Sequence, residues 1–334
     1  MNLINDIKNI TNILKDKPDD VFLTTASFEK DRCLATADNL YNYSTRFAGV
    51  INFLSKTTIN GEVKKGQTAE YLLEKLIKVD VTGIPRLITI RPYDYFKFFE
   101  IFKEELIRRE IGLKNLNITI DVSCLTKIQL IFLIKVFILD GIAKKLRILY
   151  TIPDHYNTKG DKFSRLAKGY YEPIIIPIKV SKIRKIQNTF KLCLVITGHE
   201  GQRTICAWKF VEPMETILLF TKSGDELEKI SKKQNEYLLN LSDKKNSYIN
   251  KIDITDFDIF KIKDTIKNLL KSIRKENIRV SIIPFGPKPI LIGILLRMVE
   301  LEDYDFDIIY PIPASYNSNY SEGAKKTSSF LLEF

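Results

Sequence analysis

An internal repeat constrains the fold of this chain more than any other feature of its sequence. Residues 117–157 and 277–317 follow the same plan: a short β-branched run, a loop of small residues or proline with one lysine, an apolar helical run and a second β-branched run. This order of strand, loop, helix and strand is the βαβ unit of a parallel sheet. The repeat therefore predicts a domain that occurs twice in one chain.

Further matches between the two halves occur in the same order along the sequence. The matched residues are Glu29 and Glu200, Arg32 and Arg203, Glu70 and Glu236, Lys127 and Lys288, and Tyr150 and Tyr310. The separation of the partners falls from 171 positions (29 to 200) to 160 positions (150 to 310), as expected for collinear copies of which the second has shorter loops. Each copy has the size of a small domain rather than of a solenoid repeat.

The remaining pattern predicts an α/β chain with two tandem, pseudo-symmetric Rossmann-like domains. Each is expected to hold a mainly parallel open sheet flanked by helices, because β-branched runs alternate with amphipathic segments. We place the first copy at residues 1–180 and the second at residues 181–334, with a linker at 179–190. Residues 172–177 (EPIIIP) are expected to form the last strand of the first copy, and residues 3–14 a short amphipathic helix.

The composition indicates in which compartment the protein is expected and which partners it can bind. The four cysteines show no C-x-x-C spacing, which favours buried thiols in a reducing cytoplasm and argues against a zinc site. There are only two histidines, which argues against another metal centre. No cofactor is expected. The N-terminus lacks the pattern of a secretory signal, and the longest apolar run (128–139) is too short to span a bilayer. The net charge of +11 permits an anionic partner, but the lysines are spread along the chain, so a nucleic-acid partner is only weakly supported.

Polar motifs recur where the predicted strands end, and these positions suggest a ligand site. In open α/β sheets, ligands bind beyond the carboxyl ends of the strands. A lysine in a loop that enters a helix adds its charge to free backbone N–H groups and to the helix dipole, which suits a phosphate or a carboxylate. The Walker spacing and G-x-G-x-x-G are both absent, so dinucleotide binding of the dehydrogenase type is unsupported. The candidate ligand-binding residues are Glu29, Arg32, Lys127, Tyr156, Glu200, Arg203, Lys288 and Tyr316.

Each candidate also has a structural explanation, which stays open at this point. The Glu–Arg pairs are three residues apart and equally fit an ion pair that rigidifies a turn. The two lysines also fit solvated residues, and the tyrosines fit either packing or stacking on a base. His155 and His199 occur in one copy each, and Asp121 has no carboxylate partner in the second copy. A strictly symmetric active site is therefore not expected, and no residue is assigned as catalytic.

With these lysines in place, the pattern resembles the CARF and SAVED group of Rossmann-like nucleotide sensors. Residues 121–127 (DVSCLTK) are similar to the strand-end loop D-x-T-G-G-T-K of that group, without its two glycines, and residues 284–288 (PFGPK) keep one glycine and the lysine. The resemblance implies recognition of a cyclic nucleotide or oligonucleotide in a cleft between two such domains, in antiviral signalling. It also implies that the effector is a separate polypeptide.

The sequence leads to one main hypothesis and two rivals. The main hypothesis is a sensor or adaptor that binds a phosphorylated nucleotide between the duplicated halves and acts on a separate effector protein or through self-association. The first rival is a nucleotide-cleaving enzyme with one asymmetric active site, in which His155 or His199 acts as acid or base. The second is a scaffold subunit of a defence complex that does not catalyse a reaction.

Overall fold

The computed structural model divides the chain into two compact units, each of which is described by itself. Unit 1 comprises residues 1–166 and 315–334, and unit 2 comprises residues 167–314. The structure describes residues 6–9, 19–40, 42–54, 59–91, 94–156, 167–168, 172–178, 190–222, 224, 226–244, 248–255, 257–273, 278–300 and 306–334.

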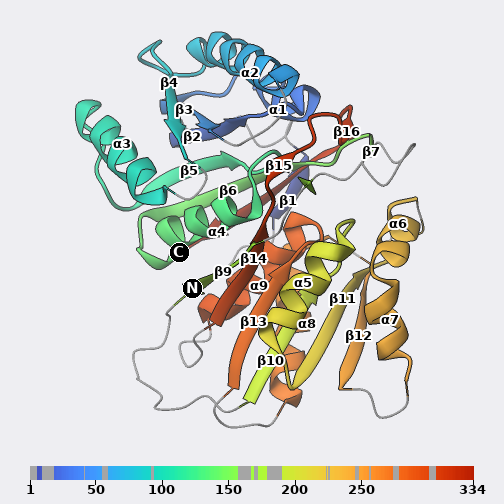
Figure 1. The fold of residues 1–334 in the computed structure, drawn as a ribbon. Coiled ribbons are helices and arrows are strands. Elements are labelled where there is room, and N and C mark those ends of the chain that lie inside the picture. The colour runs from blue at the N-terminus through green and yellow to red at the C-terminus, as the bar shows by residue number, and fades with distance from the viewer. Residues whose placement is uncertain are drawn as a thin grey trace. The chain divides into compact units, whose positions relative to one another are not determined.

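Unit 1 is built on a seven-stranded sheet with the order β1-β17-β6-β5-β2-β3-β4 (Figure 1). The five strands from β6 to β4 run parallel, and β17 and β1 are added antiparallel at one edge. The bounds are β1 (Asp6–Asn9), β2 (Asp19–Ala26), β3 (Thr45–Phe53), β4 (Arg86–Ile90), β5 (Leu116–Asp121), β6 (Ala143–Thr151) and β17 (Thr327–Glu333), with the two-residue strands β7 (His155–Tyr156), β15 (Ser315–Tyr316) and β16 (Ser321–Glu322).

Helices cover both faces of this sheet, as the alternation of strand and helix predicts. The helices are α1 (Lys30–Ala37), α2 (Ile59–Ile77), α3 (Tyr95–Arg108), α4 (Lys127–Ile134) and its π-helical continuation η2 (Lys135–Leu139). Phe22 of β2 lies in a core cluster with residues of α1 and α2. On the opposite face Phe102 of α3 contacts Phe47 of β3 and Phe137 of η2. Burial on both faces explains why the parallel strands read as continuous apolar runs.

Unit 2 repeats this architecture on a six-stranded sheet with the order β12-β11-β10-β13-β14-β9 (Figure 1). Five strands are parallel, and β9 pairs antiparallel with β14. The bounds are β8 (Ala167–Lys168), β9 (Glu172–Ile178), β10 (Phe190–Ile196), α5 (Gly201–Val211), β11 (Glu215–Thr221), α6 (Glu226–Gln234), α7 (Glu236–Ser242), β12 (Ile249–Ile254), α8 (Ile259–Ser272), β13 (Ile278–Pro284), α9 (Lys288–Glu300) and β14 (Phe306–Ile312). The two sheets confirm the predicted fold class.

Each sheet takes its antiparallel neighbour from the other half of the sequence. Strand β9 follows the first copy in the chain but pairs with β14 in unit 2, and β17 follows the second copy but pairs with β6 in unit 1. The expectation that residues 172–177 close the sheet of the first copy is therefore wrong. For the same reason the compact units differ from a division at residue 180.

The N-terminal segment also differs from the expectation. Residues 6–9 form strand β1, paired with residues 328–331, instead of part of an amphipathic helix, because β17 offers its outer backbone groups for pairing. The rest of that predicted helix, and residues 179–189 of the predicted linker, lie outside the described residues. In unit 2, residues 226–242 form two helices, α6 and α7, which meet at Asn235.

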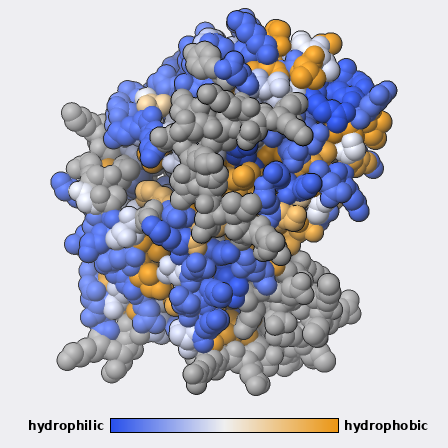
Figure 2. Space-filling view, turned by 180° about the vertical axis from the view of Figure 1, so that it is seen from behind, coloured by the Kyte–Doolittle hydropathy of each residue, from blue (hydrophilic) through white to orange (hydrophobic). Residues whose placement is uncertain are grey.

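Apolar side chains on the surface gather on one side of unit 1. Figure 2 shows hydrophobic residues on the side that carries α3 and β4. Exposed apolar residues of these elements and of the loop between α2 and β4 include Ile84, Leu87, Phe96 and Ile107. Because β4 is the last strand of its sheet, this apolar surface lies beside a sheet edge. No described helix combines the length and the apolarity that a membrane span requires.

Candidate functional site

The chemistry of each unit is expected at the carboxyl edge of its parallel strands. In unit 1 the sheet order places β2 and β5 side by side, although the chain continues from them in opposite directions across the sheet. Strands β10 and β13 have the same relation in unit 2. This reversal of strand order is the topological switch point at which open α/β proteins bind ligands.

Arg32 spans the switch point of unit 1. Its Nε donates to the carbonyl oxygen of Thr151 at 3.1 Å and its Nη2 to the carbonyl oxygen of Ser123 at 2.7 Å. Its Nη1 donates to Glu29 Oε1 at 2.9 Å, and only 5% of the residue is exposed. The side chain therefore ties α1 to the ends of β5 and β6.

Arg203 does the same work in unit 2. Its Nε donates to the carbonyl oxygen of Pro311 at 3.0 Å, Nη2 donates to the same oxygen, and Nη1 donates to Glu200 Oε2 at 2.7 Å. Thr151 and Pro311 are equivalent residues, each following the tyrosine of its copy, and each guanidinium lies within about 6 Å of that tyrosine ring. The repeated Glu–Arg motif is thus a pair of equivalent ion pairs, in which each arginine also donates to backbone carbonyl oxygens of its own unit. We refer to each of these, Glu29–Arg32 and Glu200–Arg203, as a bracket.

The two predicted phosphate lysines occupy equivalent positions. Lys127 is the first residue of α4 and Lys288 the first residue of α9, and both are half-buried. The N-terminus of α4 carries a capping box, in which Thr126 N donates to Gln129 Oε1 at 2.8 Å and Thr126 Oγ1 accepts from Gln129 N. Because this exchange already satisfies one end group of the helix, it reduces the number of N–H groups available to an anion there.

In unit 2 the loops at the switch point touch each other directly. A Cβ atom added to Gly198 would lie 1.9 Å from the carbonyl oxygen of Phe285, so the loop after β10 rests on the loop after β13. Asn235 Nδ2 also donates to the carbonyl oxygen of Gly198 at 2.7 Å. The backbone therefore fills the place where a ligand of unit 2 would enter.

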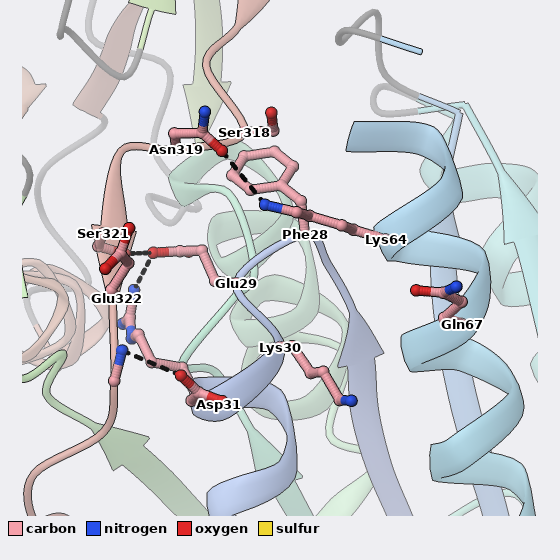
Figure 3. Close-up of a pocket in the computed structure, with 12 residues that line it drawn as sticks. Phe28, Glu29, Lys30, Asp31, Lys64, Gln67, Ser318, Asn319, Ser321 and Glu322 are labelled. Carbon is pink, nitrogen blue, oxygen red and sulfur yellow. Dashed lines mark hydrogen bonds and ion pairs between the residues drawn. The ribbon is translucent and has the colours of Figure 1, made fainter. Parts of the chain in front are cut away.

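Unit 1 holds a pocket of about 320 Å³ at the carboxyl edge of its sheet. Figure 3 shows the loop before α1 on one side of it, α2 on another and the segment after β15 on a third. The lining residues are Phe28, Glu29, Lys30, Asp31, Arg32, Lys64, Gln67, Ser318, Asn319, Ser321, Glu322 and Gly323. The lining consists mostly of charged and polar residues and brings together side chains from both ends of the sequence.

We refer to residues 318–323, which form one wall of this pocket, as the strap. Lys64 Nζ of α2 donates to Asn319 Oδ1 at 3.2 Å, and the backbone N–H of Gly323 donates to Asp31 Oδ2 at 3.1 Å. Ser321 Oγ donates to Glu29 Oε1. Figure 3 shows these three contacts from the strap to α2, to the loop before α1 and to α1 itself.

The two lysines of this pocket have no lysine at the aligned positions of unit 2. Aligned on Glu29 and Glu200, Lys30 falls on Gly201, and a Cβ atom there would lie 1.6 Å from the carbonyl oxygen of Gln234. Aligned on Glu70 and Glu236, Lys64 falls on Ile230. The second copy thus has no lysine at either position, and α5 packs directly against the end of α6.

The structure brings together some of the predicted site residues and separates others. Among the described residues, the pocket lining includes Glu29 and Arg32 and leaves out Lys127 and Tyr156. Tyr156 packs edge-on against Tyr320 at 5.0 Å between ring centroids. Glu200, Arg203, Lys288 and Tyr316 are also placed by the structure: the first three lie in unit 2, and Tyr316 lies in β15.

Sequence reasoning missed several residues of the pocket. Lys30 lies inside the recurring motif after the first strand, so its proximity to Glu29 was a usable signal. Lys64, Gln67 and Asn319 had none, because no counterpart in the second copy marks them and they come from distant parts of the chain.

Two titratable residues near these loops have distinct surroundings. Asp121, at the end of β5, is buried, and burial raises the pKa of its carboxyl group although Ser123 donates two hydrogen bonds to it. His155 is exposed, with Nε2 3.3 Å from Glu322 and Nδ1 3.6 Å from Asp154. His155 is thus a neighbour of the pocket through Glu322, whereas His199 lies in unit 2, half-buried in the loop before α5. Within the described part of the chain, no group of three metal-ligating side chains is found.

Comparison with known proteins gives no family for this chain. No family model matches it, and no curated protein shows significant similarity to it. The resemblance to the CARF and SAVED proteins therefore stays a prediction.

Proposed function

We propose that this protein is a sensor or adaptor that binds a phosphorylated nucleotide, and that unit 1 holds the ligand. The observation that carries the proposal is the polar pocket at the carboxyl edge of a parallel sheet, with two lysines that the second copy replaces by glycine and isoleucine. Packing alone does not require two lysines at this edge. Their restriction to one copy favours a single asymmetric site.

The lining supplies the chemistry that a nucleotide needs. Lys30 and Lys64 would provide charge for a phosphate, together with the N–H groups of the first turn of α1. The ring of Phe28 would offer a stacking surface for a base, and the amide of Gln67 hydrogen bonds to it. The volume of about 320 Å³ is at the lower end of the range of small-molecule sites.

The wider role rests on the resemblance to nucleotide sensors. The duplicated α/β architecture supports it, because those sensors also combine two such domains. On this basis we propose a cyclic nucleotide or oligonucleotide as ligand, antiviral signalling as the context and a separate protein as effector.

The binding proposal is tested by calorimetry and thermal shift with a panel of cyclic and linear nucleotides. We expect the wild-type protein to bind at least one of them, and Lys30→Ala together with Lys64→Ala to weaken its binding at least roughly tenfold, because each charge-assisted contact contributes about 1.5–3 kcal/mol. Lys78→Ala removes an exposed lysine at the end of α2 that does not line the pocket, and should leave binding unchanged. Equal binding by the double variant would show that the ligand sits elsewhere, with Lys127→Ala and Lys288→Ala as the next pair to test.

A nucleotide-cleaving enzyme is the second candidate, favoured by the position of His155. Its Nε2 lies 3.3 Å from the carboxylate of Glu322, which lines the pocket. A histidine so placed could exchange a proton with a bound phosphodiester. Product analysis by mass spectrometry of wild type, His155→Gln and His199→Gln decides the point. Cleavage by wild type that is lost in His155→Gln and kept in His199→Gln would make this protein an enzyme. Intact nucleotide with all three proteins would leave it a binding protein.

A further inference from the structure

The strap comes from the far end of the chain and carries polar groups onto the pocket of the first copy. It follows β15 in the sequence and lies between that strand and β17. Three of its residues contact three polar side chains of the pocket: Lys64, Glu29 and Asp31. All three contacts involve a charged side chain, and Lys64 carries the positive charge that a phosphate would need.

Asn319 is the most informative of these residues. Its side-chain oxygen accepts a hydrogen bond from Lys64 Nζ at 3.2 Å, the ammonium group that we assign to a phosphate. An amide oxygen is a neutral acceptor, whereas a phosphate oxygen is charged and forms the stronger hydrogen bond with an ammonium group. Asn319 Oδ1 thus occupies the position at Lys64 that a phosphate oxygen would take, and it is the weaker acceptor.

The strap is held in a defined conformation. Gly323 has φ of +68°, and a Cβ atom there would lie 2.7 Å from Cβ of Asp154, so the chain approaches closely only because this residue is glycine. Strand β16 pairs antiparallel with β7, which sets Ser321 opposite Tyr156 and Glu322 opposite His155. Ser318 and Ser321 are buried at 6% exposure.

Two of the strap's contacts, Asn319 with Lys64 and Glu322 with His155, lie at the surface. Asn319 and Glu322 are exposed, and β16 and β7 contain two residues each. Exposed hydrogen bonds and ion pairs contribute little to stability, because water competes for the same groups. A charged ligand would therefore meet only weak competition from Asn319 at Lys64.

We infer that the strap is an internal competitor for the pocket: Asn319 occupies Lys64 until a phosphorylated ligand replaces it and releases residues 318–323. This inference rests on the proposed nucleotide site. It gives that site a movable wall, so that ligand binding changes the position of a segment that leads directly into β17.

A disulfide between β7 and β16 tests the inference. Residues 155 and 322 are directly opposed, and opposed residues of antiparallel strands have Cα atoms about 4.5–5.5 Å apart, within the range of about 4.4–6.8 Å that a disulfide requires. In the full-length variant His155→Cys/Glu322→Cys, mild oxidation joins the two thiols and locks the strap, and dithiothreitol releases it. Because the same protein is measured in both states, the substitutions themselves cancel.

ATP is the probe, because it carries phosphates as well as a base. Its binding to the oxidised and to the reduced protein is measured by calorimetry. The inference predicts that the oxidised protein binds ATP at least tenfold more weakly than the reduced protein. Wild-type protein treated with the same oxidant controls for Cys124 and Cys206, which are partly exposed. Equal binding by both states would overturn the strap and leave the nucleotide site standing, whereas no binding by either state or by wild type would overturn both.

A single substitution provides an independent test. Asn319→Ala frees Lys64, so ATP should bind about two- to fivefold more tightly, as expected for the loss of one competing exposed hydrogen bond. Asn39→Ala is the matched control, because the Asn39 amide is exposed and donates to the carbonyl oxygen of Ala35 within its own helical segment. Weaker binding by Asn319→Ala would mean that Asn319 contacts the ligand instead of competing with it, and would contradict the inference.

Discussion

At the scale of single residues, a glutamate and an arginine make the same kind of contacts in both copies. Arg32 and Arg203 each join a glutamate three residues earlier to a carbonyl oxygen at the end of the last parallel strand. The sequence reveals these pairs because they recur in register. It cannot reveal which use they serve, because a buried bracket and a ligand site call for the same residues at the same spacing.

Loss of a bracket should destabilise its unit. Arg203 is 1% exposed, so Arg203→Met would leave Glu200 as a buried charge without its partner, at a cost of about 3–5 kcal/mol. Urea unfolding of the variant measures this cost. Lys209→Met, on the exposed face of the same helix, should change stability by less than about 0.5 kcal/mol. A similarly small change for Arg203→Met would show that the bracket is dispensable for folding.

Asp121 should make stability depend on pH in a direction opposite to that of a salt-bridged carboxylate. Burial raises the pKa of its carboxyl group in the folded state, so the folded protein holds this proton more tightly than the unfolded chain. Stability from this group is therefore lost as pH rises from about 4, the ordinary carboxyl value, through the raised pKa. Asp121→Asn should remove that loss and gain stability relative to wild type as pH increases, as urea unfolding at pH 4, 6 and 8 would measure. A constant difference between the two proteins at all three values would contradict the assignment.

At the scale of elements, the strands that are buried on both faces are the part of the fold that sequence predicts well. Strands β2, β3, β10, β11 and β13 all lie where β-branched and apolar runs place them. Strands β1 and β17 at the edge of unit 1 were not predicted, because their pairing depends on contacts between the two ends of the chain. Helix α1 was not predicted either, because it is short and begins at a charged motif.

The packing of α8 against α9 depends on one glycine. A Cβ atom on Gly293 would lie 2.7 Å from both the carbonyl oxygen of Ile259 and Cγ2 of Ile262, so Gly293→Ala should force the helices apart and cost about 1–3 kcal/mol. Gly66 is the matched control: it is exposed within α2, and no heavy atom lies within 4 Å of its added Cβ. Gly66→Ala should raise stability by about 0.4–1 kcal/mol in the same unfolding assay. Opposite signs for the two variants are the expected result.

At the scale of the whole molecule, the exchange of edge strands makes the folding of each copy depend on the other copy. Residues 1–180 contain β9, which belongs to the sheet of unit 2, and lack β17, which completes the sheet of unit 1. Neither half of the sequence can therefore form a complete sheet alone. A duplication predicts two similar domains, but it does not predict that their last strands are exchanged, since both connections use the same local sequence pattern.

Separate expression of the two halves tests this interdependence. Residues 1–180 and 181–334 should each be poorly folded or aggregated alone and should recover a defined structure when they are produced together, because each then supplies the strand that the other lacks. Co-purification through a tag on one half, followed by circular dichroism, measures the recovery. Two halves that fold independently and do not associate would contradict the exchange.

The exchange has a consequence for synthesis on the ribosome. Strand β1 is synthesised before the other described strands, yet its partner β17 is synthesised after them, and β17 also covers the edge of β6. The nascent chain must therefore expose an incomplete sheet edge until β17 has been synthesised, and a pause before that point would leave the edge open to other growing chains.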